Sequence, residues 1–443
     1  MSLYARLLSQ SGLIFAARLF GAGLVFIAQA LIARAWGAAF LGDYLVLMAV
    51  ANLTAVVLPL GFHTIGTYFA AEYRAHGNGI GLRQFLRRAY GHIAISAVVL
   101  VALAWPAIHV FGFGDSVIAH HFWPVALIML GNAMVFVSGG VLAGLKRPLL
   151  GYFADSVARP LIIVLTLVAA MGLGSADAGF ALMMWAIGIA FVGVTFVQFG
   201  FVVATARRVP LGDGQGEPNP RRWWRFAMPW VLIALATDFY FDIDLLLLAS
   251  LLDRHELAIF GVSTRIFALI SFAVTAIYIV TLPDMFESEA RADRAGFNRK
   301  VGEANIVAAG LSLLLFVAVL VGGPFALSLF GPDFVVGAGP LAVLCLALVV
   351  RSVMGPAAMV LSIHDRPAAS LPAVALGIVT LVVANLLLVP PFGLMGAAIA
   401  SLLGITLWSF SLWLIAFRLA GIDVSIFARF SARTRAAYDS AAG

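Results

Sequence analysis

Apolar residues fill most of this chain in long stretches separated by short polar segments. A transmembrane helix needs about 20 consecutive apolar residues to cross the hydrocarbon core. The pattern therefore predicts roughly twelve membrane spans. They are placed at 10–33, 41–70, 89–111, 117–144, 150–172, 178–204, 226–252, 257–284, 304–330, 337–363, 369–390 and 394–417. The predicted fold class is an all-α polytopic membrane protein.

The composition supports this class and narrows the chemistry. Hydrophobic residues make up 63% of the chain and charged residues 11%, whereas soluble proteins carry roughly 25% charged residues. The single cysteine, Cys345, excludes a disulfide framework within the chain. The sequence holds no Walker A lysine motif, no nucleophile elbow and no cluster of His or Cys ligands. We therefore expect no metal site, no cofactor and no ATP-driven transport by this chain alone.

The net charge of +6 reflects membrane topology rather than nucleic-acid binding. If the N-terminus lies in the cytoplasm, 21 of the 27 Lys and Arg residues fall in cytoplasmic segments and 2 in outer loops. Cytoplasmic loops carry such an excess of positive residues, so both termini are expected inside, with the basic segments near anionic lipid headgroups. The outer loops are all short, which counts against a membrane-bound glycan polymerase or ligase.

The polar segments divide the chain into two halves. We expect an N-lobe at 1–206, a Gly- and Pro-rich cytoplasmic linker at 207–225, a C-lobe at 226–418 and a basic cytoplasmic tail at 419–443. Phe111-Gly112 and Arg147-Pro148 recur 219 residues later as Phe330-Gly331 and Arg366-Pro367, which indicates an internal repeat. Repeats of this kind place the substrate site at their interface.

Seven charged residues fall inside the predicted spans. They are Arg18, Arg159, Asp238, Asp242, Asp244, Arg265 and Arg351. A charge at the membrane centre costs about 2.5–3.5 kcal/mol on insertion scales, so such residues normally face a wet cavity or a charged partner. The predicted interior is therefore polar.

Helical spacing groups some of these residues with polar neighbours. Arg18 shares a stripe with Gln29, Asn52 shares one with His63, and Arg351 shares one with Gly355. Each stripe is typical of a cavity lining, and equally of polar contacts that hold helices together. The arginines Arg159 and Arg265 each have competing interpretations. Arg159 is placed to pair with Asp155 at i,i+4, and Arg265 to reach the interface, pair with Asp244 or face the cavity.

Three aspartates in the seventh span suggest ion coupling. Asp238 and Asp242 are spaced i,i+4, and Asp244 points to another side of the same helix. Two buried carboxylates on one face repel each other, and a proton or a monovalent cation relieves that repulsion. We interpret Asp238, Asp242 and Asp244 as a candidate H⁺ or Na⁺ coupling site. The alternative is that neighbouring Arg or Tyr side chains satisfy the carboxylates.

Short motifs along nearly the whole chain resemble the multidrug/oligosaccharidyl-lipid/polysaccharide (MOP) exporter superfamily, and its Wzx-type O-antigen flippases in particular. The residues that carry this resemblance follow in chain order. They are Ala33-Arg34 with Gly37, Gly42 and Tyr44; Asp244 with the four leucines after it; Ala258-Ile-Phe260; Thr264-Arg265-Ile266; and Gly393 with Gly396-Ala397-Ala398. The second half departs from the family pattern at Ala258-x-Phe260, where G-x-Y is usual.

The resemblance implies two six-helix lobes in a V that open alternately to each side of a bacterial inner membrane. It implies a transporter rather than an enzyme, a monomer, and contact with other glycan-assembly proteins. The implied substrate is an undecaprenyl-diphosphate-linked oligosaccharide, moved from the inner to the outer leaflet. Arginine suits phosphate, so the candidate headgroup residues are Arg18, Arg351, Arg265 and Arg159, with Gln29, Asn52 and His63 lining the path.

Two other transporters remain open at this point. A cation-coupled multidrug exporter of the same superfamily would use the acidic and aromatic residues around Asp238 and Asp242. A lipid II flippase would usually carry two further C-terminal helices, where this chain has only a short basic tail.

Overall fold

The computed structural model describes residues 3–173, 175–211, 220–290, 294–363 and 367–427. Within these ranges every regular element is a helix, and ten helices are long and apolar enough to cross a membrane. The predicted all-α membrane fold is confirmed. The centre of the predicted linker, Arg366 of the repeat and most of the predicted tail lie outside the described residues.

The chain forms two compact units, Met1–Ile243 and Asp244–Gly443. The boundary between them falls inside one helix, α11 (Tyr240–Leu248). The division into two six-span lobes joined by a linker stays a prediction. Each unit is described by itself below.

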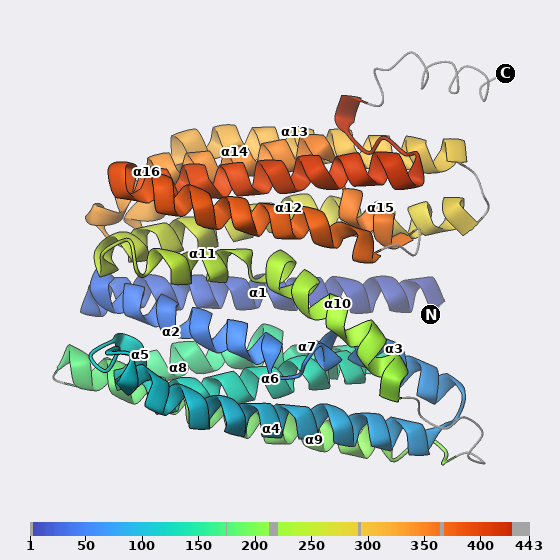
Figure 1. The fold of residues 1–443 in the computed structure, drawn as a ribbon, viewed down its shortest axis with the longest axis horizontal. Coiled ribbons are helices and arrows are strands. Elements are labelled where there is room, and N and C mark those ends of the chain that lie inside the picture. Colours follow the sequence, from blue (N-terminus) through green and yellow to red (C-terminus); the bar gives the residue numbers. More distant parts are fainter. Residues whose placement is uncertain (1–2, 174, 212–219, 291–293, 364–366, 428–443) are drawn as a thin grey trace. The chain divides into compact units, whose positions relative to one another are not determined.

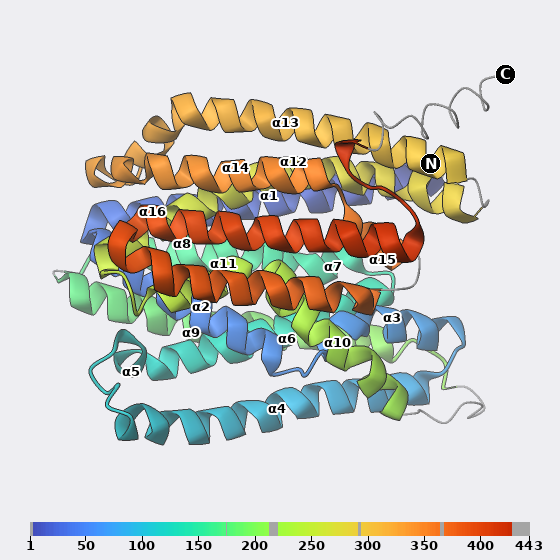
Figure 2. The ribbon, with the colours of Figure 1, turned by 45° about the horizontal axis from the view of Figure 1, so that its top comes forward.

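The first unit is a bundle centred on α6, which packs against α2, α3 and α9 (Figures 1 and 2). Its elements are α1 (Leu3–Trp36), α2 (Ala38–Val57), α3 (Phe62–Ala75), α4 (Gly79–Val110), α5 (Val117–His120), α6 (Phe122–Gly144), α7 (Pro148–Phe153), the π-helix η1 (Ala154–Ala158), α8 (Arg159–Ala170), α9 (Ala176–Ala206) and α10 (Pro220–Asp238).

The span predicted at 41–70 is not one helix. It ends as α2 at Val57 and restarts as α3 at Phe62, with Gly61 at φ 84° between them. Pro59 lacks an N–H donor and favours such a break. A Cβ on Gly61 would lie 2.3 Å from the carbonyl oxygen of Ala227 on α10, so only glycine fits where α10 crosses the break. Apolarity alone does not reveal this interruption, which is why the sequence predicted a continuous span.

The span predicted at 150–172 contains a π-helical turn. The Arg159 N–H donates to the carbonyl of Ala154, five residues earlier. Pro160 follows and cannot donate to Ser156, its normal partner in an α-helix. The Ser156 carbonyl instead faces Gly21 of α1. A Cβ on Gly21 would lie 1.9 Å from the Ser156 oxygen, so the two helices approach closely at this glycine. The turn therefore sets Asp155 and Arg159 beside the closest approach of α1.

The start of α10 is fastened to α3. The Arg222 guanidinium donates to Glu72 at 2.6 Å and to the Tyr68 hydroxyl at 3.1 Å, and the Glu72 hydrogen bond raises the pKa of Arg222. Trp223, which is buried, donates its indole N–H to the Tyr73 hydroxyl at 2.9 Å. These contacts explain why α10 belongs to the first unit.

The second unit is built around α14, which packs against α12, α13 and α16 (Figure 2). Its elements are the end of α11, α12 (Arg254–Ala290), α13 (Arg294–Ser328), the 3₁₀ helix η2 (Pro332–Gly337), α14 (Ala338–Met354), α15 (Ala357–Ile363), η3 (Pro367–Ser370) and α16 (Leu371–Ala420). Helix α16 holds the last two predicted spans as two arms, which meet at a non-helical Gly393.

The predicted repeat has a structural counterpart. The Phe-Gly pair after α4 and the Phe-Gly pair after α13 both end their helices, and Gly112 and Gly331 both have positive φ, 77° and 147°. A short helical turn follows each glycine, α5 in one unit and η2 in the other, and then the central helix, α6 or α14. The two units therefore share this local element order.

Candidate functional site

Arg18 lies near the middle of α1 and is exposed. Its guanidinium carbon sits 4.7 Å from the centre of the Tyr152 ring on α7, a cation–π contact. No carboxylate in the described part of the chain forms an ion pair with it. Gln29, which the sequence places on the same stripe, is 2% exposed, so the two ends of this stripe have different surroundings.

Arg351 is the counterpart in the second unit. It lies in the last turn of α14, is exposed, and has its guanidinium carbon 5.9 Å from the Trp408 ring centre on α16. Its backbone carbonyl accepts from Gly355, where α14 breaks before α15. Like Arg18, it forms no ion pair with a carboxylate among the described residues. These two arginines thus present positive charge on candidate membrane-spanning helices.

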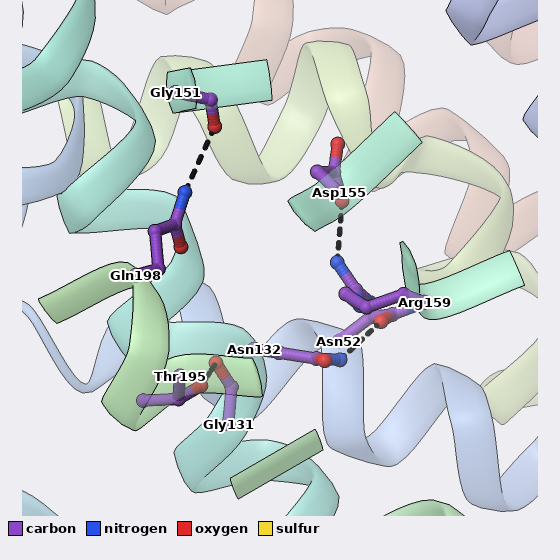
Figure 3. Close-up of polar contacts among 8 residues, drawn as sticks. All are labelled: Asn52, Gly131, Asn132, Gly151, Asp155, Arg159, Thr195 and Gln198. Carbon is purple, nitrogen blue, oxygen red and sulfur yellow. Dashed lines mark hydrogen bonds and ion pairs between the residues drawn. The ribbon is translucent and has the colours of Figure 1, made fainter. Parts of the chain in front are cut away.

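Arg159 is in a different state. Its side chain is buried, pairs with Asp155 and packs against two aromatic rings, with its guanidinium carbon 5.6 Å from Phe136 and 5.1 Å from Phe191. The i,i+4 pair expected from the sequence is confirmed, and Figure 3 shows Arg159 reaching toward Asp155 across the π-helical turn. The charge of Arg159 is balanced inside the unit.

Asn52 belongs to a polar network in the core of the first unit. Its Oδ1 accepts a hydrogen bond from Asn132 of α6 at 2.9 Å. Nearby, Thr195 of α9 donates to the carbonyl of Gly131, and Gln198 donates to the carbonyl of Gly151 (Figure 3). Buried side-chain amides and hydroxyls need such partners. The network therefore fastens α2, α6, α7 and α9 together.

His63 and Arg265 are both half-buried. His63 starts α3 after the break and bonds through its Nε2 to the neighbouring Thr64 hydroxyl at 3.0 Å, so the break separates it from Asn52 on α2. Arg265 lies on α12, next to the buried Thr264. The pairing of Arg265 with Asp244 considered above does not form.

The three aspartates of the seventh span lie in distinct surroundings. The helix is interrupted at Phe239, so Asp238 ends α10 and is exposed, whereas Asp242 and Asp244 belong to α11 and are buried. The single helix that the sequence assumed for Asp238 and Asp242 is therefore absent.

Asp244 is the most enclosed of the three, with 0% of its surface exposed. Its Oδ1 accepts from the Asn385 amide at 2.8 Å, and its Oδ2 accepts from the Ser401 hydroxyl at 2.5 Å. Asn385 and Ser401 stand on the two arms of α16, on either side of Gly393. The carboxylate thus joins α11 to both arms, and neutral donors alone hydrogen-bond to it in the described part of the chain.

Sequence reasoning missed the partners in both networks. Asn132, Asn385 and Ser401 are polar residues inside apolar spans. That position is the signal they give, because such residues tend to find a partner in the membrane. The identity of that partner depends on packing between helices far apart in the chain.

The fold is similar to that of several solved multi-pass membrane proteins. It is similar to an inward-facing multidrug resistance MATE family transporter of the MOP superfamily, with a TM-score of 0.73 and 14% identity over 96% of this chain and 99% of that one. It is equally similar to the lipid II flippase MurJ in an inward closed conformation, with a TM-score of 0.73 and 14% identity over 96% and 91% of the two chains. An outward-facing MATE transporter gives a TM-score of 0.60 at 13% identity over 96% of both chains.

Neither a protein-family model nor a curated protein sequence matches the chain. At the identities of the solved structures the likeness establishes the fold and leaves the substrate to be argued from the residues.

Proposed function

We propose that this chain is a flippase that moves a lipid-diphosphate-linked oligosaccharide from the inner to the outer leaflet by alternating access. The observation that carries the proposal is a pair of arginines, Arg18 and Arg351, exposed within membrane-spanning helices and not neutralised by a carboxylate among the described residues. An anionic headgroup would supply the negative charge that balances these two arginines.

The arrangement of arginines favours an anionic cargo over a structural role. A guanidinium that only braces helices is expected to be buried and paired, as Arg159 is with Asp155. Arg18 and Arg351 instead present their donors at the surface beside an aromatic ring. Five N–H donors in a planar fork match the oxygens of a phosphate in a bidentate way. These two residues are the proposed headgroup contacts. Arg265 is a further candidate that rests on the sequence alone.

The cargo class follows from this charge and from the fold. A diphosphate headgroup with its sugars would cross through the polar interior, while a polyprenyl tail such as undecaprenyl stays in the bilayer. Gln29, Asn52 and His63 are proposed to line the path. The protein would work as a monomer in a bacterial inner membrane, with both termini in the cytoplasm and other glycan-assembly proteins nearby.

Ion coupling is proposed to centre on Asp244. Its carboxylate is fully buried and hydrogen-bonded to neutral groups, so burial of its negative charge requires a proton or a cation. The Asn385 Oδ1 is also buried and lacks a hydrogen-bond partner, which leaves a second oxygen beside the carboxylate. Oxygen ligands suit Na⁺, and a proton would meet the same need.

A cation-coupled multidrug exporter is the second candidate. The observation in its favour is Asp238, which is exposed at the interruption between α10 and α11, next to Phe239, whose ring lies 6.2 Å from that of Phe136. A carboxylate among aromatic rings suits an organic cation. A membrane glycan polymerase or ligase has no comparable group in its favour.

Reconstitution tests the function. Purified protein is placed in liposomes with an undecaprenyl-diphosphate-linked oligosaccharide, and a membrane-impermeant glycosidase added outside measures the accessible glycan. Accessible glycan is expected to exceed the outer-leaflet share found in protein-free liposomes. The absence of any excess under every H⁺ and Na⁺ gradient would argue against a flippase.

A further inference from the structure

Helix α1 approaches the π-helical turn η1 without side chains between the two backbones. A Cβ on Gly21 would lie 1.9 Å from the Ser156 carbonyl oxygen and 3.2 Å from Cγ of Pro160. Arg18 lies about one turn before Gly21 on α1, and Tyr152 lies about one turn before Ser156. The contact that brings the two backbones together therefore also sets Arg18 beside Tyr152.

The π-helical turn also decides which side of the helix Tyr152 occupies. In an unbroken α-helix, Tyr152 and Arg159 would share a face, because two turns separate them. Arg159 is buried, with its guanidinium carbon 5.1 Å from the centre of the Phe191 ring on α9. The extra residue in the π-helical turn rotates the preceding helix by roughly a quarter of a turn. Tyr152 is only half-buried, and its ring meets Arg18 of α1 instead.

Two further helices hold the backbone that carries Tyr152. The carbonyl of Gly151 accepts from the amide of Gln198, a buried residue of α9, at 2.9 Å (Figure 3). A Cβ on Gly151 would lie 2.6 Å from the carbonyl oxygen of Gly139 on α6, so α7 and α6 are in backbone contact. A tyrosine side chain has only two torsions. On this backbone its ring is a firm support for the longer side chain of Arg18.

We propose that Tyr152 is a positioning residue, whose ring holds the Arg18 guanidinium in place for the anionic headgroup. This inference rests on the proposed function. The guanidinium carbon lies over the ring, 4.7 Å from its centre, where the negative face of the ring attracts a cation. Such a contact consumes none of the N–H donors, so they remain for phosphate oxygens. Fixing Arg18 before the ligand arrives lowers the entropic cost of binding.

Binding of undecaprenyl diphosphate to the purified full-length protein tests the inference. Tyr152→Leu removes the aromatic face and is expected to raise the Kd about two- to fivefold, the range for a cation–π contact at an exposed site. Tyr152→Phe keeps that face and should bind like the wild type. The matched control is Phe153→Leu, which removes an exposed ring next to Tyr152 on α7 and should leave the Kd unchanged.

A fluorination series separates positioning from general stabilisation. Fluorine atoms on a phenylalanine placed at position 152 withdraw electron density from the face of the ring and keep its shape nearly constant. The Kd should therefore rise with each added fluorine. In an Arg18→Ala background this rise should vanish, whereas in an Arg351→Ala background it should persist in full.

Three results would overturn the role of Tyr152 while leaving the flippase proposal intact. They are a constant Kd along the fluorination series, equal losses from Tyr152→Leu in the Arg18→Ala and Arg351→Ala backgrounds, and a lowered unfolding temperature of Tyr152→Leu with an unchanged Kd. If Arg18→Ala alone leaves the Kd of the wild type unchanged, the proposed headgroup contact fails, and this inference fails with it.

Discussion

Replacing Arg18 and Arg351 together with glutamine is expected to weaken binding of undecaprenyl diphosphate by about a hundredfold or more. A hydrogen bond to a charged group contributes about 1.5–3 kcal/mol, so each loss corresponds to roughly a tenfold to hundredfold change in Kd, and two independent losses multiply. Glutamine keeps some donor capacity and removes only the charge and the forked geometry. The Kd of detergent-purified variants gives the answer.

The control for this double variant removes the same charge elsewhere. Arg87 and Arg88 are exposed near the start of α4, in a segment predicted to face the cytoplasm, and their replacement by glutamine should leave the Kd within about twofold, as expected for screened surface charges. An equal loss in both double variants would show a general effect of net charge and would remove the case for a dedicated site.

Asp244→Asn is expected to abolish the response of transport to an ion gradient and to leave binding of the diphosphate lipid unchanged. Asparagine is nearly the same size as aspartate and can still bond to Ser401, but it cannot carry the charge that a proton or Na⁺ would balance. Gradient-driven translocation should fall at least about tenfold, a factor that corresponds to a free energy of about 1.4 kcal/mol. The measurement is glycan accessibility in liposomes with and without an imposed H⁺ or Na⁺ gradient.

The neighbouring aspartates provide the matched comparison. An Asp238→Asn/Asp242→Asn variant with full ion dependence would exclude these two residues from coupling and leave Asp244 as the site. Full ion dependence in Asp244→Asn, with loss in the paired variant, would transfer the role to Asp238 and Asp242, as the i,i+4 spacing first suggested.

Hydropathy predicted the all-α membrane fold because each span needs only length and apolarity. Local spacing likewise predicted the Asp155–Arg159 pair, since both residues sit on consecutive turns. The interruptions at Gly61 and Phe239 escaped prediction, because a broken helix keeps the same apolar composition when another helix packs against it.

The candidate site could be predicted only in part. Charges at membrane depth identified Arg18, Arg351 and Asp244 as unusual, because their cost is a property of the residue itself. The i,i+4 spacing indicated that Arg159 is paired, whereas no local pattern shows that Arg18 is exposed. Asn385 and Ser401 lie 141 and 157 residues from Asp244, and no local pattern connects groups that meet only through tertiary packing.

Headgroup selectivity shows whether the protein binds an anionic cargo. The Kd of the wild-type protein is measured for one polyprenyl lipid that carries a diphosphate, a hydroxyl or a quaternary ammonium group. The diphosphate lipid is expected to bind at least about tenfold more tightly than the other two, and this preference is expected to disappear in the Arg18→Gln/Arg351→Gln variant. Equal binding of all three lipids, or tightest binding of the ammonium lipid, would contradict an anionic cargo.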